Sequence, residues 1–427
     1  MSSSPLPAVE HEPLRREQWI VLIAAFLGWM FDGLEMGLFP IAARSALIDM
    51  MRYVNEAGEL VNPPEADVKQ FYSYLVALFL VGAAAGGWIF GWLGDKLGRV
   101  KTMALAIAVY AGFTGLCAFA TEPWHLAGCR VMAALGMGGE WALGVALVME
   151  CWPEKFRPIL AGAIGAAANF GFLAISILGA TIAVTPDRWK WIMVAGAVPG
   201  LLALFVLFFI PESKKWKESV GTGEKSRPLR EVFSAKLAGR TILGIALASV
   251  PFMVTWGAVS GFLPLWADQM GGKENPFAKG VIQIMLSIGA IVGCFLGPMI
   301  AKRFGRRISY FLLCFGSLLV CQYLFRAFNA YTFSFIVVSG IAGLLSASFY
   351  GWLPLYLPEL FPTRVRATGQ GIAFNSGRIF AAVAALFTGA VHGSQYANAC
   401  ALIAFLYIAG MIIIWFAPET KGKPLPD

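Results

Sequence analysis

The chain has 427 residues, of which 58% are hydrophobic and only 14% are charged, and its formal net charge is +8. This composition excludes an ordinary soluble domain, in which about a quarter of the residues are charged. A nucleic-acid partner is not indicated, because most Lys and Arg residues fall in alternate loops on the side of both termini. By the positive-inside rule, that asymmetry predicts a membrane protein with both termini in the cytoplasm.

The apolar residues form about twelve blocks, each long enough to cross a bilayer core of about 30 Å. The blocks lack the alternation of membrane barrel strands, so transmembrane helices are predicted. The predicted spans are 18–44, 71–94, 101–120, 125–151, 158–184, 189–210, 240–269, 277–301, 308–328, 331–357, 367–391 and 396–417. The predicted fold class is therefore an all-α membrane protein with twelve transmembrane helices.

A polar and basic segment, 211–239, separates the sixth predicted span from the seventh. We therefore predict an N-terminal six-helix bundle (1–210), a cytoplasmic linker (211–239) and a C-terminal six-helix bundle (240–427). The longest predicted outer loop is 45–70. Residues 1–17 have no apolar core or cleavage site, so we expect the first span to act as a retained insertion signal.

Three short polar motifs occur twice in the same order, either 207 or 209 residues apart. The pairs are Gly98-Arg99 with Gly305-Arg306, Glu150–Arg157 with Glu359–Arg366, and Pro211–Ser213 with Pro418–Thr420. Repetition at a nearly constant spacing predicts that the chain consists of two copies of one structural unit. In a very apolar chain, such a repeat is typical of secondary transporters.

The segment Gly91–Lys101, between the second and third predicted spans, follows the pattern G-x-x-x-D-K-x-G-R-x-K. It resembles the loop signature of the major facilitator superfamily. The resemblance implies a twelve-helix carrier that rocks two bundles around a midplane site. In the second copy of the unit, Lys302 stands where Asp95 stands in the first. We therefore expect Asp95 to be the more important partner at this loop.

The two Glu–Arg motifs and Pro211–Trp216 resemble cytoplasmic motifs of the sugar porters and their organic-acid relatives. Those relatives include the sialate, lactate and aromatic-acid proton symporters. The resemblance implies an inner gate in which the glutamates bridge to arginines at other helix ends. The expected gating residues are Asp95, Arg99, Glu150, Arg157, Glu359 and Arg366. The structural alternative is a set of positive-inside residues with incidental counter-charges.

Five ionisable residues fall inside predicted spans, where charge is costly and usually lines a polar cavity. Four of them are expected to couple protons: Asp32, Glu35, Arg130 and Glu140. Asp32 and Glu35 are three residues apart and share one helix face. In proton-coupled sugar porters, an arginine at the place of Arg130 faces an aspartate of the first span. The resemblance therefore implies that Asp32 is the proton site and Arg130 its partner. A permanent salt bridge, or a protonated Glu140 bonded to a neighbouring helix, is the structural alternative.

The fifth residue, Arg378, lies about 18 Å along its predicted helix from Arg366. A guanidinium can hold a carboxylate with two hydrogen bonds, so Arg378 is the expected anchor of an anionic substrate. The alternative is an ion pair with Glu140 or Glu35. Asn169 lies 209 residues before Arg378 and is expected to face it across a pseudo-symmetric cavity. The other substrate-binding candidates are Asn375, Trp141, Trp256, Tyr350 and Trp352, although each aromatic side chain alone is more often explained by packing.

The seventh predicted span lacks the glutamine pair that sugar porters use, and it also lacks the polar signature of lactate permeases. We therefore predict a secondary active transporter, a proton symporter of a small organic anion such as a monocarboxylate or an aromatic or sugar acid. One alternative is a carrier of a neutral solute such as a sugar or polyol. The other is a receptor that binds a nutrient without transporting it.

No enzyme is predicted, because no nucleophile–base or metal-binding constellation is present in the sequence. The seven cysteines have no metal-ligand spacing, so neither a metal nor a cofactor is expected. The expected partners are the organic anion, protons and the lipid bilayer. The expected location is the inner (plasma) membrane, with the protein acting as a multi-pass monomer.

Overall fold

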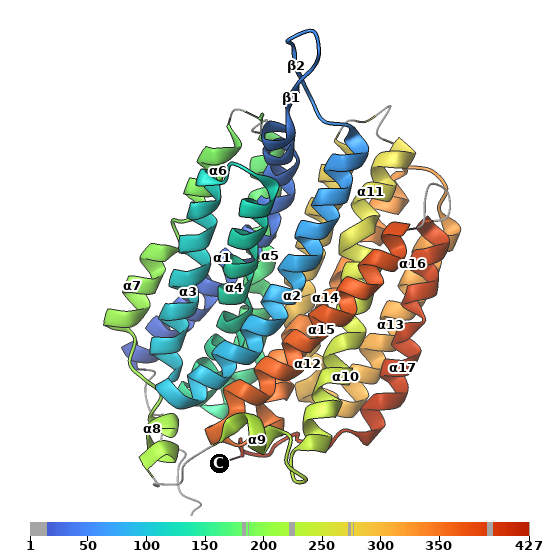
Figure 1. Cartoon of the computed structure of the whole chain (residues 1–427). Coiled ribbons are helices and arrows are strands. Elements are labelled where there is room, and N and C mark those ends of the chain that lie inside the picture. The colour runs from blue at the N-terminus through green and yellow to red at the C-terminus, as the bar shows by residue number, and fades with distance from the viewer. Residues whose placement is uncertain are drawn as a thin grey trace, which may run out of the picture.

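The computed structural model describes residues 15–181, 185–186, 188–221, 227–271, 275, 277–390 and 396–426. Apart from loops, these residues form helices and one antiparallel hairpin, which pairs β1 Tyr53–Val54 with β2 Leu60–Val61. The hairpin stands at one end of the molecule, and the last described residues lie at the opposite end (Figure 1). We call these two ends the hairpin face and the linker face.

Seven helices come from the first half of the chain, among the residues that the structure describes. They are α1 Arg16–Met51, α2 Glu65–Leu97, α3 Arg99–Leu116, α4 Pro123–Cys151, α5 Arg157–Thr181, α6 Trp189–Ala195 and α7 Gly200–Phe209. Gly98 separates α2 from α3 with φ +106°, a left-handed conformation that glycine adopts without strain. Gly305 repeats this geometry between α12 and α13 with φ +90°, so the repeated sequence motif folds into the same reversal twice.

The second half of the chain contributes the remaining long helices. They are α10 Ala238–Val254, α11 Ser260–Gly271, α12 Ala278–Phe304, α13 Arg306–Ala327, α14 Phe333–Leu360, α15 Arg366–Ala390, α16 Tyr396–Ala404 and α17 Leu406–Ile413. A π-helical turn, Thr255–Val259, joins α10 to α11 and follows Pro251 in the last turn of α10. Proline removes a helical hydrogen bond, so a local change of winding is expected there.

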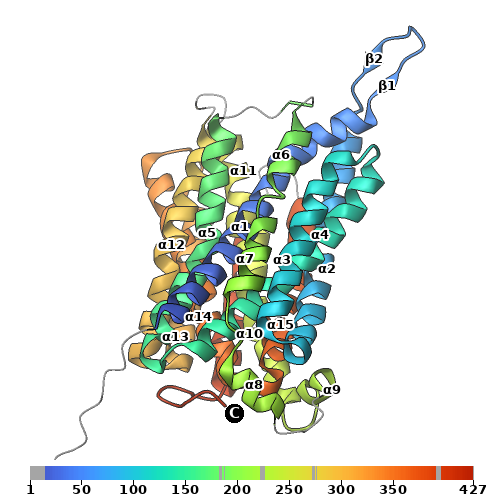
Figure 2. The ribbon, with the colours of Figure 1, turned by 90° about the vertical axis from the view of Figure 1, so that its left-hand side faces the viewer.

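The predicted linker, 211–239, is partly helical. It contains α8 Lys214–Gly221 and α9 Pro228–Val232. Both short helices lie at the linker face, near the last described residues (Figure 2).

Eleven segments of the described residues are helical, long and apolar enough to cross a membrane. Eleven of the twelve predicted spans therefore have a membrane-length counterpart. The block at 367–391 forms α15, which has 25 residues but is not among the eleven. Its polar residues explain the lower hydropathy: Arg366, Thr368, Gln370, Asn375, Ser376 and Arg378 are all buried.

The predicted outer loop 45–70 is wrong at both of its ends. Helix α1 continues to Met51 and α2 starts at Glu65, with the hairpin between them. The helix continues because Ala46 and Leu47 are buried in an apolar cluster that also contains Leu75 of α2. Burial of this apolar surface stabilises helix beyond the predicted membrane span.

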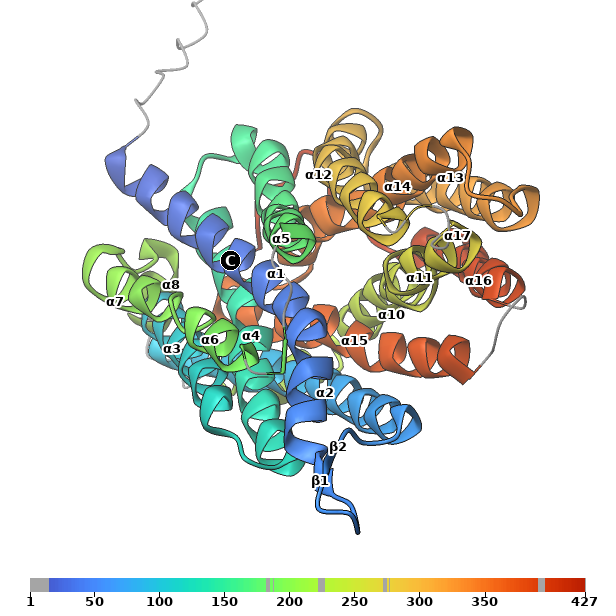
Figure 3. The ribbon, with the colours of Figure 1, turned by 90° about the horizontal axis from the view of Figure 1, so that it is seen from above.

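Seen along the axis from the hairpin face to the linker face, α1–α7 gather on one side and α10–α17 on the other (Figure 3). The two groups meet where α2 packs against α15 and α5 packs against α12. Glycines allow this close approach, because a Cβ atom at Gly91 would meet Ala367 and one at Gly162 would meet Phe295 and the backbone of Cys294. The largest cluster of buried apolar side chains extends through both groups.

Candidate functional site

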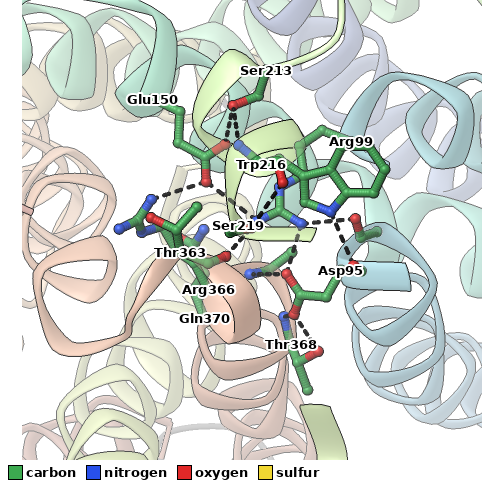
Figure 4. A network of polar contacts seen from close by, with 12 residues as sticks. Asp95, Arg99, Glu150, Ser213, Trp216, Ser219, Thr363, Arg366, Thr368 and Gln370 are labelled. Carbon is green, nitrogen blue, oxygen red and sulfur yellow. Dashed lines mark hydrogen bonds and ion pairs between the residues drawn. The ribbon is translucent and has the colours of Figure 1, made fainter. Parts of the chain in front are cut away.

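A buried ionic network lies near the linker face, where α2, α3, α4 and α15 meet (Figure 4). Arg99 donates to Asp95 Oδ1 at 2.7 Å and to Glu150 Oε1 at 3.3 Å. Arg366 donates to the same Glu150 oxygen at 2.9 Å. None of these four side chains is exposed. The network therefore joins α15 to the helices of the first half without contact with water.

Asp95 extends the connection by binding the first turn of α15. The hydroxyl and backbone N–H of Thr368 donate to Asp95 Oδ2 at 2.5 Å and 2.8 Å, and the N–H of Ala367 donates to Oδ1 at 3.2 Å. A carboxylate at a helix N-terminus satisfies free N–H groups and interacts favourably with the helix dipole. Asp95 therefore caps a helix whose first turn lies 273 residues later in the sequence, so the contact depends on the tertiary fold.

The second half repeats part of this network. Arg306 donates to Glu359 at 2.6 Å and 3.0 Å, and Thr420 donates to Glu359 Oε2 at 2.5 Å. Ser213 likewise donates to Glu150 Oε2 at 2.5 Å. Both glutamates therefore bind arginines at other helix ends, and their role as an inner gate stays a prediction. The repeat also explains Ser213 and Thr420, which occupy equivalent places and which the sequence analysis did not single out.

The two remaining acids of the repeat, Glu212 and Glu419, each hold the N-terminus of a helix. Glu212 accepts the N–H of Arg99 at 3.0 Å, and Glu419 accepts the N–H of Arg306 at 2.9 Å. Burial raises the pKa of Glu419, but backbone hydrogen bonds from Arg306, Lys421 and Arg307 outweigh it, and the pKa lies below its usual range. Arg157, by contrast, pairs at 3.0 Å with the exposed Glu154 of its own segment.

A second group of buried charges lies deeper in the molecule. Its members are Asp32, Glu35, Arg130, Glu140 and Arg378, none more than 2% exposed. The predicted contact between Arg130 and Asp32 is wrong, because Arg130 donates to Glu35. Glu35 lies one helical turn beyond Asp32 and has a longer side chain, so it meets the guanidinium first. Thr114 of α3 donates to the same Glu35 oxygen at 2.8 Å.

Asp32 instead neighbours Glu140, and the two carboxyl groups act on each other electrostatically, although neither oxygen of Asp32 has a hydrogen-bond partner among the described residues. Glu140 reaches this position because its carboxyl group lies against Gly28 of α1, where a Cβ atom would collide with it. Arg378 is a cation that acts on Asp32 electrostatically. Two neighbouring buried carboxyl groups repel each other when both are ionised, so a proton on one of them stabilises the pair.

Arg378 is buried on α15 with two unused donors. Its Nε and Nη1 atoms have no hydrogen-bond partner among the described residues. The predicted face-to-face arrangement with Asn169 is not present. Asn169 Nδ2 donates to Gly165 O at 3.4 Å and to Cys294 Sγ at 3.7 Å. Asn169 therefore lies on the contact between α5 and α12 and does not complete the surroundings of Arg378.

An aromatic layer bridges the two halves beside these charges. Trp141 of α4 stacks on Phe374 of α15 with ring centroids 3.6 Å apart. Trp29, Phe252 and Tyr350 surround the stack, with centroids 4.8–6.4 Å from Phe374. Two of the predicted aromatic residues thus meet here. Trp29, Phe252 and Phe374 were missed, although Trp29 and Phe374 are close in sequence to Asp32 and Asn375.

The other predicted candidates differ in position. Trp256 lies on the π-helical turn, with its ring 6.0 Å from that of Phe172. Asn375 donates to Gly371 O at 3.1 Å, and its side-chain oxygen has no partner among the described residues. Trp352 does not join the aromatic layer: its indole N–H donates to Ser309 at 2.8 Å between α13 and α14. Two residues after Tyr350, it points away because successive helical positions differ by about 100°.

A polytopic helical protein with two repeated halves, a charged lock where they meet and isolated charges between its helices defines a membrane transporter rather than an enzyme. The chain belongs to the Major Facilitator Superfamily, whose family model matches residues 21–385. The predicted resemblance is thereby confirmed, and so is a multi-pass location in a membrane.

Related proteins cover the whole chain. The inner membrane metabolite transport protein YgcS of Escherichia coli is 28% identical, over 100% of this chain and 96% of its own length. A cis,cis-muconate transport protein of Acinetobacter baylyi is 24% identical, over 95% of both chains. The solved structure of the proton:xylose symporter XylE with 6-bromo-6-deoxy-D-glucose has a TM-score of 0.77 at 17% identity, covering 96% of this chain and 98% of XylE. That similarity shows the fold.

Proposed function

We propose that the chain is a proton-coupled symporter of a small organic anion that works by alternating access. In this proposal it is a monomer in the inner (plasma) membrane, with twelve transmembrane helices in two bundles of six and with cytoplasmic termini. Helix α15 is the twelfth span: its 25 residues can cross a core of about 30 Å. Its polar side chains are buried between helices, so they do not face lipid.

The observation that carries the proposal is the buried guanidinium of Arg378 with two donors that have no partner among the described residues. A buried cation without a full set of hydrogen bonds is costly, and a carboxylate satisfies it with two parallel bonds. A neutral sugar would supply hydroxyl groups but no countercharge. The group therefore favours an anion as the transported solute.

Proton coupling follows from the balance of charges in the same cluster. Arg130 is occupied by Glu35, which leaves Asp32 and Glu140 to share Arg378. Two carboxyl groups in one buried site do not both ionise readily, so a shared proton balances the charge. When a substrate carboxylate occupies Arg378, the acids lose their counter-charge and keep the proton. Anion and proton would then bind together, as symport requires.

The aromatic layer restricts the form of the solute. Trp141, Phe374 and Tyr350 come from three helices, one of the first half and two of the second, and their rings pack together where the halves meet. Flat aromatic walls favour a planar or unsaturated carbon skeleton by stacking. The name of the muconate-transporting relative, which describes an unsaturated acid, supports the same class of substrate.

The network at the linker face would form the inner gate. Asp95 and Glu150 bind α15 across the two halves, so breaking these contacts must accompany opening on that side. In this proposal the described conformation has its inner gate closed. Glu359 and Arg306 would hold the second bundle together as it rocks. Arg157 belongs to the same end of the molecule but makes its ion pair within the first half.

Ligand binding to the purified protein tests the proposal. We expect carboxylates such as cis,cis-muconate to raise the melting temperature and sugars such as xylose to leave it unchanged. Arg378→Ala should weaken the acid's affinity roughly tenfold to a hundredfold, since it removes charge-assisted hydrogen bonds, and Arg378→Lys should weaken it less. A melting shift with sugars alone, equal in both variants, would contradict the anion and favour a neutral-solute carrier.

A further inference from the structure

Tyr110 of α3 is a buried residue that the proposed transport cycle has not yet used. Its side chain is 0% exposed, and its hydroxyl has no hydrogen-bond partner among the described residues. Burying a hydroxyl without a partner is unfavourable, because the hydroxyl loses its hydrogen bonds to water, so such groups are rare in folded proteins. Phenylalanine would fill the same space without this cost. The presence of the hydroxyl therefore points to a role other than packing.

The surroundings of Tyr110 are acidic. The three groups that act on it electrostatically are Glu140, Asp32 and Glu35, which come from α4 and α1. Contact between α3 and α4 is close at this level, because a Cβ atom on Gly136 would meet the backbone of Tyr110. Gly136 precedes Glu140 by four residues, which is one helical turn, so this packing places Tyr110 next to the turn of α4 that carries Glu140.

Helix α3 contacts both parts of the charge cluster along one face. Thr114 follows Tyr110 by four residues, which is one helical turn, and donates to Glu35 at 2.8 Å. Tyr110 lies one turn nearer the linker face, at the level of Asp32 and Glu140. The acid pair and Glu35 are themselves separated by about one turn of α1. Tyr110 therefore lies between the proposed proton site and the Glu35–Arg130 pair.

Both sides of this position offer proton acceptors. Glu35 Oε2 and Glu140 Oε2 are buried without hydrogen-bond partners among the described residues, and both oxygens of Asp32 are in the same state. Buried polar groups in such a number are normally satisfied by each other or by internal water. A hydroxyl that both donates and accepts can connect them.

We propose that the Tyr110 hydroxyl relays protons between the Asp32–Glu140 pair and Glu35 through bridging water molecules. The proposal rests on the proton coupling proposed above. In one transfer, a protonated Glu35 passes its proton through water to Tyr110 Oη while the phenol O–H passes its own proton through water to a carboxylate of the pair. One O–H bond forms and one breaks at the phenol, which is regenerated unchanged. No redox partner is needed.

The other helices packed on α3 add little charge at this level. Helix α7 has no titratable residue, α6 carries only Lys190 near its start, and the charged residues of α2 fall at its two ends, in 65–69 and 95–96. Arg130 of α4 faces Glu35 from the hairpin side, and Arg378 of α15 faces Asp32. An arginine therefore lies at each end of the relay. Each arginine stabilises the ionised form of the carboxyl group that has given up its proton.

Tyr110→Phe tests the relay, because it removes only the hydroxyl. We expect the variant to fold with unchanged or higher melting temperature, since an unsatisfied group has gone. Uptake driven by a pH gradient in proteoliposomes should slow by on the order of 100-fold, the usual value of a positioned proton donor. Exchange of labelled for unlabelled substrate, which moves no net proton, should keep its rate. Tyr407→Phe is the matched control: it is equally buried, and the groups that act on it most are Cys314, Cys321, Ser317 and Tyr350.

The outcomes separate the relay from a structural role. If Tyr110→Phe keeps normal gradient-driven uptake, or slows exchange and uptake together, the relay is wrong. An unaltered protein that ignores the pH gradient would overturn the proton coupling itself. A coupled unaltered protein with an unaffected variant would leave the proposed function intact and remove only the relay.

Discussion

At the scale of single residues, Glu140 owes its position to a glycine on the facing helix. Its carboxyl group occupies the space where Gly28 would carry a Cβ atom. This contact places the Glu140 carboxyl group beside Asp32, which lies one turn further along α1. A small residue on α1 is therefore part of the proton site, although it has no polar side chain.

Gly28→Ala should displace the Glu140 carboxyl group and weaken its interaction with Asp32. Because the atom in the way is the end of a flexible side chain, we expect the fold to survive. Gradient-driven accumulation of substrate should fall, while binding of the anion to Arg378 persists. Transport and ligand-induced melting shifts measure the two effects. Gly112→Ala is the control, since a Cβ atom there meets nothing within 4 Å; an equal effect of both changes would contradict this role.

The sequence could not predict which of the buried charged residues contact each other. The sequence predicted five buried charges, and all five are buried. It paired Arg130 with Asp32, whereas the partner is Glu35. The two acids lie on one helix face about 4.5 Å apart along the axis, and only the tilt and packing of α1 against α4 decide between them. The same limit applies to Trp352, whose direction depends on helix rotation.

At the scale of helices, the two copies of the Glu–Arg motif form different connections. Glu150 binds Arg99 of its own half and Arg366 of the other half. Glu359 binds Arg306 and Thr420, which both belong to the second half. The repeat in sequence predicted a network in each half, with Asp95 the more important partner because Lys302 stands at its place in the second copy. Only the structure distinguishes the one that crosses between the halves, because the motif contains no information about its distant partners.

Glu150→Gln should loosen the contact of α15 with the first half. Two buried guanidinium groups would lose their shared anion, a change that costs about 3–5 kcal/mol in comparable buried pairs. We expect faster hydrogen–deuterium exchange of the backbone amides at 363–370. Glu359→Gln provides the matched control from the other copy and should leave exchange in that segment unchanged. Equal exchange in both variants would mean that Glu150 does not lock the two halves together.

At the scale of the whole molecule, the closed linker face and the buried charges behind it both fit the proposed alternating-access cycle. The two groups of helices are joined by a dry ionic network at the linker face. The second group of buried charges, which contains Asp32, Glu140 and Arg378, lies between that network and the hairpin face. The fold and the family could be predicted from the sequence, because the apolar blocks, the repeat and the loop motif are each visible in short stretches of it. The polar α15 also formed a helix as predicted, although its composition is lower in hydropathy than that of the other spans.

The central claim is that movement of the anion is coupled to a proton on Asp32. The most direct measurement is simultaneous anion uptake and internal acidification in proteoliposomes with an acidic exterior. The unaltered protein should accumulate the anion with matching proton entry. Asp32→Asn should exchange substrate but no longer accumulate it. Asp49→Asn, on the same helix but bonded to Trp189, should behave like the unaltered protein. Accumulation by Asp32→Asn at the normal level, or uptake without proton entry, would contradict the account.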